Sequence, residues 1–218
     1  MADQMADYVT QAVLNAYREQ AAYAAQQRDA LWQQRPHVPK RSFGVGILGL
    51  GLLGQAVAAA LAPYGFPLLG WSRDRKTVAG VESFAGAAEL RAFLARTRVL
   101  VCLLPSTPQT RDLVDRARLM QLPRGAFLVN IARGELVVDA DLISVLDAGH
   151  LAGATLDVFR EEPLPPGHPF WHHPRITLTP HVAAATLVED SVAQIAAKIR
   201  RIEQGLPISG VVDRVRGY

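Results

Sequence analysis

An arginine, a carboxylate and a histidine each follow an apolar run of this sequence, at the point where the run ends. Arg133 lies in residues 130–134 (NIARG), Glu162 in residues 157–163 (DVFREEP) and His181 in residues 179–184 (TPHVAA). A guanidinium can stabilise charge that develops on an oxygen, and an imidazole can transfer a proton near neutral pH. Each residue alone is more often a solvated or structural side chain. Three such groups at the ends of successive strands indicate one candidate catalytic site.

A glycine-rich turn lies upstream of these residues. Gly49, Gly51 and Gly54 have GxGxxG spacing, after a β-like run and before an alanine-rich helical run. In such a turn the first glycine permits the tight bend, the second lets the backbone approach a pyrophosphate, and the third allows close helix–strand packing. The free N–H groups of the helix N-terminus, around Leu52 and Leu53, then face the phosphates. The turn predicts a dinucleotide site; the alternative is a glycine-rich turn without a ligand.

The end of the next strand predicts which dinucleotide is bound. Enzymes that prefer NAD usually place an acid about 20 residues after the glycine turn, on the ribose hydroxyls. Here Ser72 and Arg73 occupy that place, Lys76 follows closely, and Asp74 is expected to point outward. A guanidinium can bind a 2′-phosphate through two hydrogen bonds, whereas an acid would repel it. The pattern favours NADP(H), with NAD(H) weaker, and a solvated basic turn is the alternative.

These residues need a sheet that brings strand ends together. Apolar runs predict strands at residues 43–48, 67–71, 99–104, 126–131, 153–158 and 176–179. Helical patterns fall at residues 52–63, 87–95, 113–121, 140–148 and 186–204. Alternating strands and helices predict an α/β fold, a doubly wound parallel sheet of the Rossmann type, whose ligands bind at the carboxyl ends of the strands.

A long amphipathic helix is predicted to precede this sheet, over residues 2–28. Met5, Val9, Val13 and Tyr17 form an apolar stripe along it. Soluble monomers avoid such exposed stripes, so we expect another domain or a second subunit to cover it, and a homodimer is predicted. The expected division is a helix and linker (1–36), an NADP-binding Rossmann domain (37–183), and a C-terminal helix and tail (184–218).

Composition narrows the class of protein further. The chain has 218 residues, half of them hydrophobic, which is enough for a sizeable core in one or two domains. Its net charge of +3 comes from scattered cations, so no nucleic-acid partner is expected.

Residues 43–62 are as apolar as a membrane span, but a strand, a glycine turn and a helix explain them, so no membrane association is expected. The single cysteine, Cys102, suits a reducing compartment such as the cytoplasm. Trp171, His172 and His173 lack further ligands at metal spacing, so no metal is expected.

The order of the motifs resembles the D-isomer-specific 2-hydroxyacid dehydrogenases. The resemblance is carried by the glycine turn, WSR at residues 71–73, LLPxTxxT at 103–110, NxARG, DVFxxEP and TPH, with SFAG at 83–86 and VDRVRGY at 212–218. It implies that Arg133 holds the substrate carboxylate and carbonyl, and that His181 is the acid–base with Glu162 as its partner. It also implies a cofactor lining of Leu104, Pro105, Thr110, Ile131, Ala132 and Asp157, the last near the nicotinamide amide.

The implied reaction is NADPH-dependent reduction of small 2-oxo acids, such as glyoxylate and hydroxypyruvate, to 2-hydroxy acids. Members of the family open with a substrate domain, whereas this sequence begins at the helix that follows it. We therefore expect a truncated chain that binds NADPH and reduces its substrate poorly. Two alternatives stay open: a non-catalytic NADP-binding or dimerisation module, and another member of the family. Ser72 and Arg73 argue against an NAD-dependent phosphoglycerate dehydrogenase, and the Glu–His pair differs from the Gln–His arrangement of formate dehydrogenases.

Overall fold

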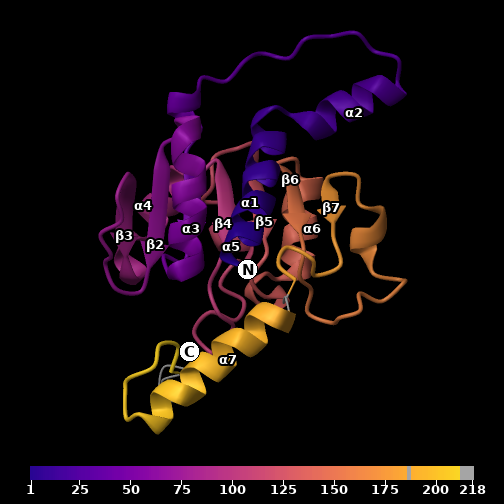
Figure 1. The fold of residues 1–218 in the computed structure, drawn as a ribbon. Helices are drawn as coiled ribbons and strands as arrows, with labels where there is room; N and C mark the ends of the chain where they lie inside the picture. The colour runs from indigo at the N-terminus through magenta and orange to yellow at the C-terminus, as the bar shows by residue number, and fades with distance from the viewer. Residues whose placement is uncertain (186–187, 212–218) are drawn as a thin grey trace.

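A seven-stranded parallel sheet forms the centre of the computed structural model, which describes residues 1–185 and 188–211 (Figure 1). The strands lie in the order β3-β2-β1-β4-β5-β6-β7, and every neighbouring pair is parallel. Their bounds are β1 (Val45–Leu48), β2 (Leu68–Ser72), β3 (Val81–Ala85), β4 (Val99–Cys102), β5 (Ala126–Asn130), β6 (Leu151–Leu156) and β7 (Ile176–Leu178). The order reverses between β1 and β4, the place where such sheets bind dinucleotides.

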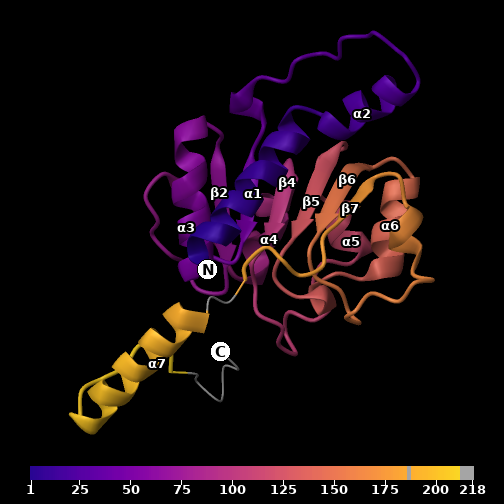
Figure 2. The same ribbon diagram turned by 45° about the vertical axis from the view of Figure 1, so that its right-hand side comes forward.

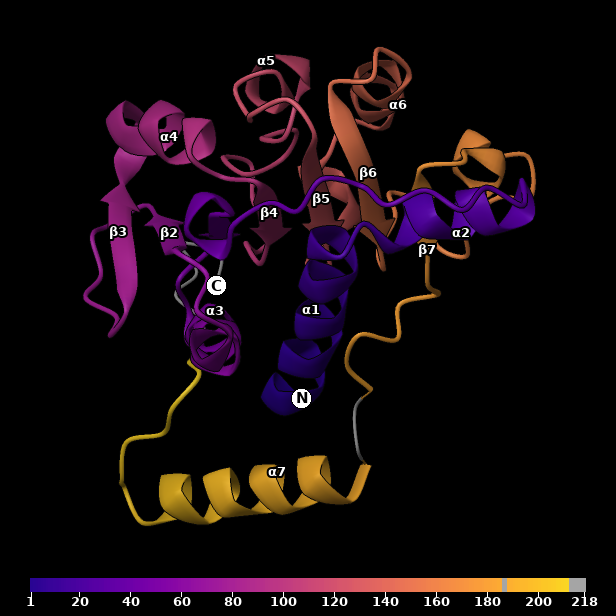
Figure 3. The same cartoon turned by 90° about the horizontal axis from the view of Figure 1, so that it is seen from above.

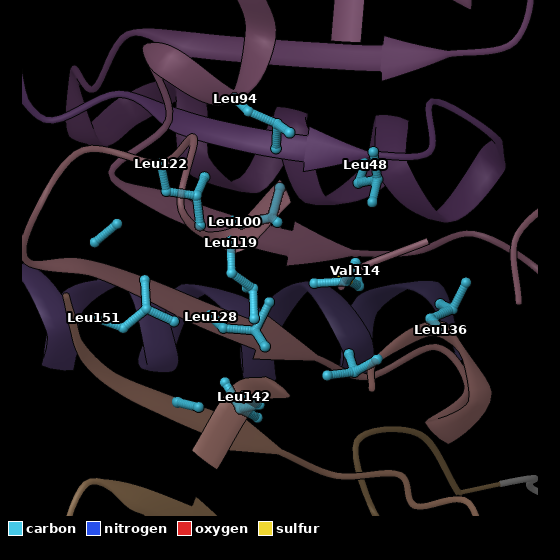
Figure 4. Close-up of a cluster of buried hydrophobic side chains, with 14 of the residues drawn as sticks. Leu48, Leu94, Leu100, Val114, Leu119, Leu122, Leu128, Leu136, Leu142 and Leu151 are labelled. Atoms are coloured by element: carbon cyan, nitrogen blue, oxygen red, sulfur yellow. The ribbon is translucent and has the colours of Figure 1, made fainter. Parts of the chain in front are cut away.

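Helices cover both faces of the sheet, as a doubly wound fold requires (Figure 3). The α-helices of the described residues are α1 (Ala2–Tyr17), α2 (Gln20–Arg28), α3 (Leu52–Leu61), α4 (Gly86–Ala95), α5 (Arg116–Leu119), α6 (Asp139–Asp147) and α7 (Val188–Glu203). One face carries α1 and α3, and the other carries α4, α5 and α6. The second face is filled mainly by leucines, drawn in Figure 4. The predicted fold class is confirmed.

The apolar stretch at residues 43–62 forms β1, the glycine turn and α3, as predicted. In the described part of the chain, no helix is long and apolar enough to span a bilayer. Cys102 ends the central strand β4 and is fully buried; burial raises the pKa of its thiol to about 12.

The prediction of one helix over residues 2–28 is wrong. The helix ends at Tyr17, and α2 begins at Gln20 after Glu19 adopts a left-handed conformation (φ 52°). Tyr17 makes edge contacts with Phe43 and Phe66, and the apolar face of α1 ends with this residue. The next helix, α2, has no fully buried residue. The sequence has neither glycine nor proline there to signal the break.

The prediction that another domain or subunit covers the apolar stripe of α1 is also wrong. Met5, Val9 and Val13 are buried against the chain's own sheet and α3, in one hydrophobic core with Val45 and Ile47. Figure 2 shows α1 lying across the sheet beside α3. The expected domain division remains a prediction, although α1 shares this core.

Two further elements, β3 and α5, differ from the prediction. The edge strand β3 was not predicted, because its side chains are mostly half-exposed and polar residues interrupt the apolar pattern. The helix expected at residues 113–121 shrinks to α5, because Val114 bridges Val137 in an extended conformation and Asp115 caps the helix at Arg118 N.

The last described helix, α7, lies within the predicted range of 186–204, of which residues 186 and 187 fall outside the description. Figures 1 and 2 place α7 away from the sheet, and large apolar side chains along it are exposed. The motif at residues 212–218 lies outside the described residues.

Candidate active site

The glycine turn has the geometry that a dinucleotide site needs. Gly49 has φ 121°, and a Cβ there would lie 2.9 Å from the carbonyl of Leu103. A Cβ on Gly54 would lie 1.9 Å from the carbonyl oxygen of Gly49, so only glycine lets α3 pack this closely. At Gly51, by contrast, a Cβ would meet nothing within 4 Å. The turn is therefore tight on its inner side and open on the side from which a pyrophosphate would approach.

The N-terminus of α3 faces the same opening. Its cap is Gly51, so no side chain satisfies the first N–H groups. Leu52, the first helical residue, is 87 % exposed, and Leu53 is half-buried. A helix N-terminus with uncapped N–H groups attracts phosphate through its partial positive charge.

The basic residues after β2 lie at the same edge of the sheet. Ser72 is buried, and its hydroxyl donates to the carbonyl of Asp74 (2.7 Å), so it shapes the turn. Arg73 is exposed, and its Nε lies 3.8 Å from the Asp74 carboxylate, which itself points outward as expected. Arg75 is engaged by Glu89, whereas Lys76 is exposed at the surface. A positively charged rim thus follows β2, with Arg73 at its start.

The loop after β4 carries the next expected cofactor contacts. Leu104 and Pro105 are half-buried at its start. The Thr110 hydroxyl donates to the carbonyl of Pro105 (2.6 Å) and accepts from Thr107 N (2.8 Å), so this side chain holds the loop in shape. Farther along the edge, Ile131 and Ala132 are almost fully buried, one in each of the two hydrophobic cores.

Arg133 is presented by a tight turn after β5. The buried Asn130 side chain accepts from Ala132 N (3.2 Å) and donates to the carbonyl of Arg133 (2.9 Å). A Cβ on Gly134 would lie 1.9 Å from the backbone of Phe159, so only glycine lets this turn meet the segment after β6. Arg160 Nε donates to the carbonyl of Val137 (2.9 Å), which joins the same two segments again. The turn of Arg133 and the loop of Glu162 are therefore packed together.

His181 and Glu162 form a direct pair. The imidazole Nδ1 lies 2.7 Å from Glu162 Oε2, and Glu162 Oε1 accepts from Phe159 N (2.9 Å). Burial acts to raise the pKa of Glu162, but these two hydrogen bonds and the charges of His181 and Arg133 outweigh it, so the pKa lies below its usual range. Because Nδ1 is engaged by the carboxylate, Nε2 is the nitrogen left to meet a substrate.

Asp157 lies beneath this pair and has no exposed surface. Its carboxylate accepts hydrogen bonds from Thr179 Oγ1 (2.5 Å), Val182 N (2.8 Å) and Ala183 N (2.8 Å). These bonds offset the cost of burying the charge, and they fix the chain on both sides of His181. A contact between Asp157 and a nicotinamide remains a prediction.

A pocket of about 570 Å³ opens beside the His181–Glu162 pair. Its walls are mostly apolar: Phe159, Pro163, Leu164, Trp171, Leu178 and Pro180.

Two of the residues 171–173 have other partners. Trp171 Nε1 donates a hydrogen bond to the carbonyl of Pro165, and His173 faces Asp147. Among residues 1–185 and 188–211 no group of three or more His, Cys, Asp or Glu side chains is placed to hold a metal ion.

The parallel sheet brings all the predicted segments to one edge, from the glycine turn to His181. The residues that support them were not predicted in those roles: Asn130, Gly134, Thr179 and Tyr8. Asn130 and Gly134 stand inside the NxARG motif, and that position was the signal available. Tyr8 lies 171 residues from its partner Thr179. No local pattern in the sequence connects the two.

The comparisons with known proteins agree with this geometry. Residues 10–183 match the NAD-binding domain of the D-isomer specific 2-hydroxyacid dehydrogenases. The fold, the glycine turn and this match together define the class: the chain belongs to the D-isomer specific 2-hydroxyacid dehydrogenase family.

Individual members of the family are similar to this chain over nearly all of its length. Glyoxylate/hydroxypyruvate reductase A of Salmonella heidelberg is 48 % identical over 99 % of this chain, which spans 69 % of that protein. A 2-hydroxyacid dehydrogenase from Xanthobacter autotrophicus, solved with NADPH and MES, is 44 % identical with a TM-score of 0.96, covering all of this chain and 90 % of that one. An NADPH-dependent glyoxylate/hydroxypyruvate reductase from Sinorhizobium meliloti, solved with NADP and sulfate, is 40 % identical with a TM-score of 0.95, covering all of this chain and 70 % of that one.

Proposed function

We propose that this chain takes part in the NADPH-dependent reduction of small 2-oxo acids, glyoxylate and hydroxypyruvate, to 2-hydroxy acids. The observation that carries the proposal is the His181–Glu162 contact of 2.7 Å at the edge of the sheet where Arg133 and the open glycine turn also lie. The names of the relatives in Salmonella and Sinorhizobium support the choice of substrates.

The residues present fit an NADP-type cofactor. The open side of Gly51 and the uncapped N-terminus of α3 suit the pyrophosphate, and Arg73 with Lys76 suits a 2′-phosphate. When bound, the cofactor supplies the hydride, and the protein supplies position and charge. Leu104, Pro105, Thr110, Ile131, Ala132 and Asp157 are the proposed lining of the nicotinamide side.

In this proposal two side chains of the protein act on the substrate, Arg133 by charge and His181 by proton transfer. Arg133 holds the substrate carboxylate and stabilises the negative charge that grows on the keto oxygen as hydride arrives. His181, protonated and oriented by Glu162 through Nδ1, donates a proton from Nε2 to that oxygen. Glu162 stays ionised because its pKa is lowered, and its charge favours the protonated imidazole.

The cofactor assignment is tested by titrating the chain with NADPH and with NADH, following nucleotide fluorescence. A charge-assisted pair between Arg73 and a 2′-phosphate contributes about 1.5–3 kcal/mol, so Arg73→Ala should weaken NADPH binding about ten- to a hundredfold and leave NADH binding unchanged. Arg75→Ala is the matched control, since Glu89 already engages Arg75. Equal affinity of the wild type for both nucleotides would contradict the assignment.

The reaction is tested on the same preparation by NADPH oxidation with glyoxylate. Arg133 is exposed and the His181 side chain is 49 % exposed in this chain, so water screens both charges. We therefore expect NADPH to bind well and turnover to be slow, with His181→Ala abolishing the turnover that remains. Oxidation that is equally fast in His181→Ala would remove His181 from the reaction, and NADPH binding with no turnover would favour a non-catalytic module.

We also propose that the chain forms homodimers, in a reducing compartment such as the cytoplasm. Since α1 is covered within the chain, the support comes instead from the segment after α2. There Trp32 is 99 % exposed and Leu31 is 51 % exposed, on a stretch that extends beyond the domain in Figure 1. Two copies of one apolar patch can cover each other across a two-fold axis.

A further inference from the structure

The segment that carries His181 follows β7 without regular secondary structure, so its side-chain contacts determine where the imidazole lies. His181 has φ 55°, a left-handed conformation that is strained for a residue with a side chain. Its N–H donates to the carbonyl of Asp157 (2.9 Å). Strain of this kind persists only where the surroundings hold the backbone in place.

Two residues of α1 reach this segment from the other end of the chain. The Tyr8 hydroxyl lies 2.5 Å from Thr179 Oγ1, two residues before His181. The Gln4 side-chain oxygen accepts from Ala185 N (2.7 Å), four residues after it. Tyr8 and Gln4 are one turn apart, so one face of α1 holds both ends of the segment.

The direction of the hydrogen bonds follows from their partners. An ionised carboxylate can only accept, so Thr179 must donate its single proton to Asp157 Oδ1 (2.5 Å). Thr179 can then only accept from Tyr8, so the phenol is the donor. Tyr8 is suited to this, because burial and the charge of Asp157 raise the pKa of the phenol, which keeps the proton that it donates. A chain of hydrogen bonds therefore runs from Tyr8 through Thr179 to Asp157.

Asp157 completes the connection to the pair. Its carboxylate also accepts from the backbone N–H groups of Val182 and Ala183, directly after His181. The fully buried Asp157 carboxylate thus binds the backbone beside the imidazole directly and is connected to Tyr8 through Thr179.

We propose that Tyr8 and Gln4 are positioning residues for His181: from α1 they fix residues 179–185 so that the imidazole Nδ1 meets Glu162. The proposal rests on the proposed reductase function, because it gives His181 its role. Neither α1 residue touches the reacting atoms. They act through the backbone of the segment, and α1 is thereby part of the catalytic apparatus as well as of the core.

The test is Tyr8→Phe, which keeps the ring and removes the hydroxyl. We expect NADPH oxidation with glyoxylate to slow about five- to tenfold, with NADPH affinity unchanged, because a small displacement of an acid–base group costs rate more than cofactor binding. The NMR resonances of the His181 imidazole, assigned by their loss in His181→Gln, should move towards those of Glu162→Gln. The matched control is Tyr17→Phe, which removes a phenol of the same helix that faces His37.

Gln4→Met removes the other contact and should displace the same resonances in the same direction. In a Glu162→Ala background, which removes the partner of Nδ1, Tyr8→Phe should slow the reaction less than in the wild type, since the contact it supports is already gone. A merely structural role would give equal slowing in both backgrounds and would overturn the proposal, as would unmoved His181 resonances in both variants. If the wild type binds NADPH without turnover, the reductase function fails, whereas the resonances still test the positioning.

Discussion

At the scale of single residues, the charge on Glu162 is set by its neighbours. Its carboxylate accepts from His181 and from Phe159 N, and its pKa is lowered in spite of burial. It therefore keeps its negative charge throughout the neutral pH range. Over this range the carboxylate favours the protonated imidazole at every pH.

The prediction is made for Glu162→Gln. The amide preserves the size of the side chain but removes the charge that favours protonated His181. Without that charge the proton is held less firmly, so the pH at which the reductive rate falls should move down. A pH–rate profile of NADPH oxidation measures it. The neighbouring Glu161→Gln should leave the profile in place, and an unmoved profile in Glu162→Gln would exclude Glu162 from this role.

The sequence was sufficient to place the residues that follow strand ends. The position of Arg133 and His181 at one edge could be predicted because strands of one parallel sheet end at the same edge, so spacing along the chain becomes proximity in space. Tyr8 and Thr179 could not be predicted in this way, because their contact depends on how α1 crosses the sheet. Thr110 shows the same limit: its position was predicted, but not the use of its hydroxyl to hold its own loop.

At the scale of elements, α1 shows how far an apolar stripe can be interpreted. The stripe correctly predicted a helix with one buried face, yet Met5, Val9 and Val13 face the chain's own core. Periodicity identifies which face is buried and says nothing of what covers it. The break at Glu19 has a similar cause, since α1 ends where its supporting surface ends, with Tyr17 against Phe43 and Phe66.

Val9→Ala tests this position of α1. Val9 is fully buried, and losing two methyl groups and leaving a cavity should cost about 2 kcal/mol. The Tm should fall by about 4–8 °C, by the same amount at every protein concentration. Gln11→Ala, on the exposed side of the same helix, should leave the Tm nearly unchanged. A Val9→Ala effect that vanished on dilution would instead place the stripe in an interface between subunits.

At the scale of the whole molecule, apolar surface that is not covered within the chain is concentrated after α2 and along α7. In the described residues, Trp32 and Leu31 belong to the first region, and Val192, Ile195 and Ile199 to the second. Exposed apolar patches of this kind mark interaction sites. The sheet is well packed up to the edge that carries the candidate site, whereas these apolar side chains of the two outlying segments are exposed.

The dimer is tested by light scattering and sedimentation at micromolar concentration. We expect the wild type to be dimeric and Trp32→Ala to be shifted towards monomer, because a fully exposed indole supplies a large apolar contact. Trp171→Ala is the control, a partly exposed tryptophan beside the candidate active site. A wild type that remains monomeric throughout would rule out the homodimer.

The buried thiol of Cys102, at the end of the central strand, can report how often the sheet opens. The thiol is the single one in the sequence, has no exposed surface, and has a pKa raised to about 12, so a thiol reagent in the solvent meets neither the sulfur nor a thiolate. Since β4 lies between β1 and β5, modification must wait until the middle of the sheet opens. The rate of labelling in native buffer therefore counts whole-sheet openings, separately from fraying of α2 or α7.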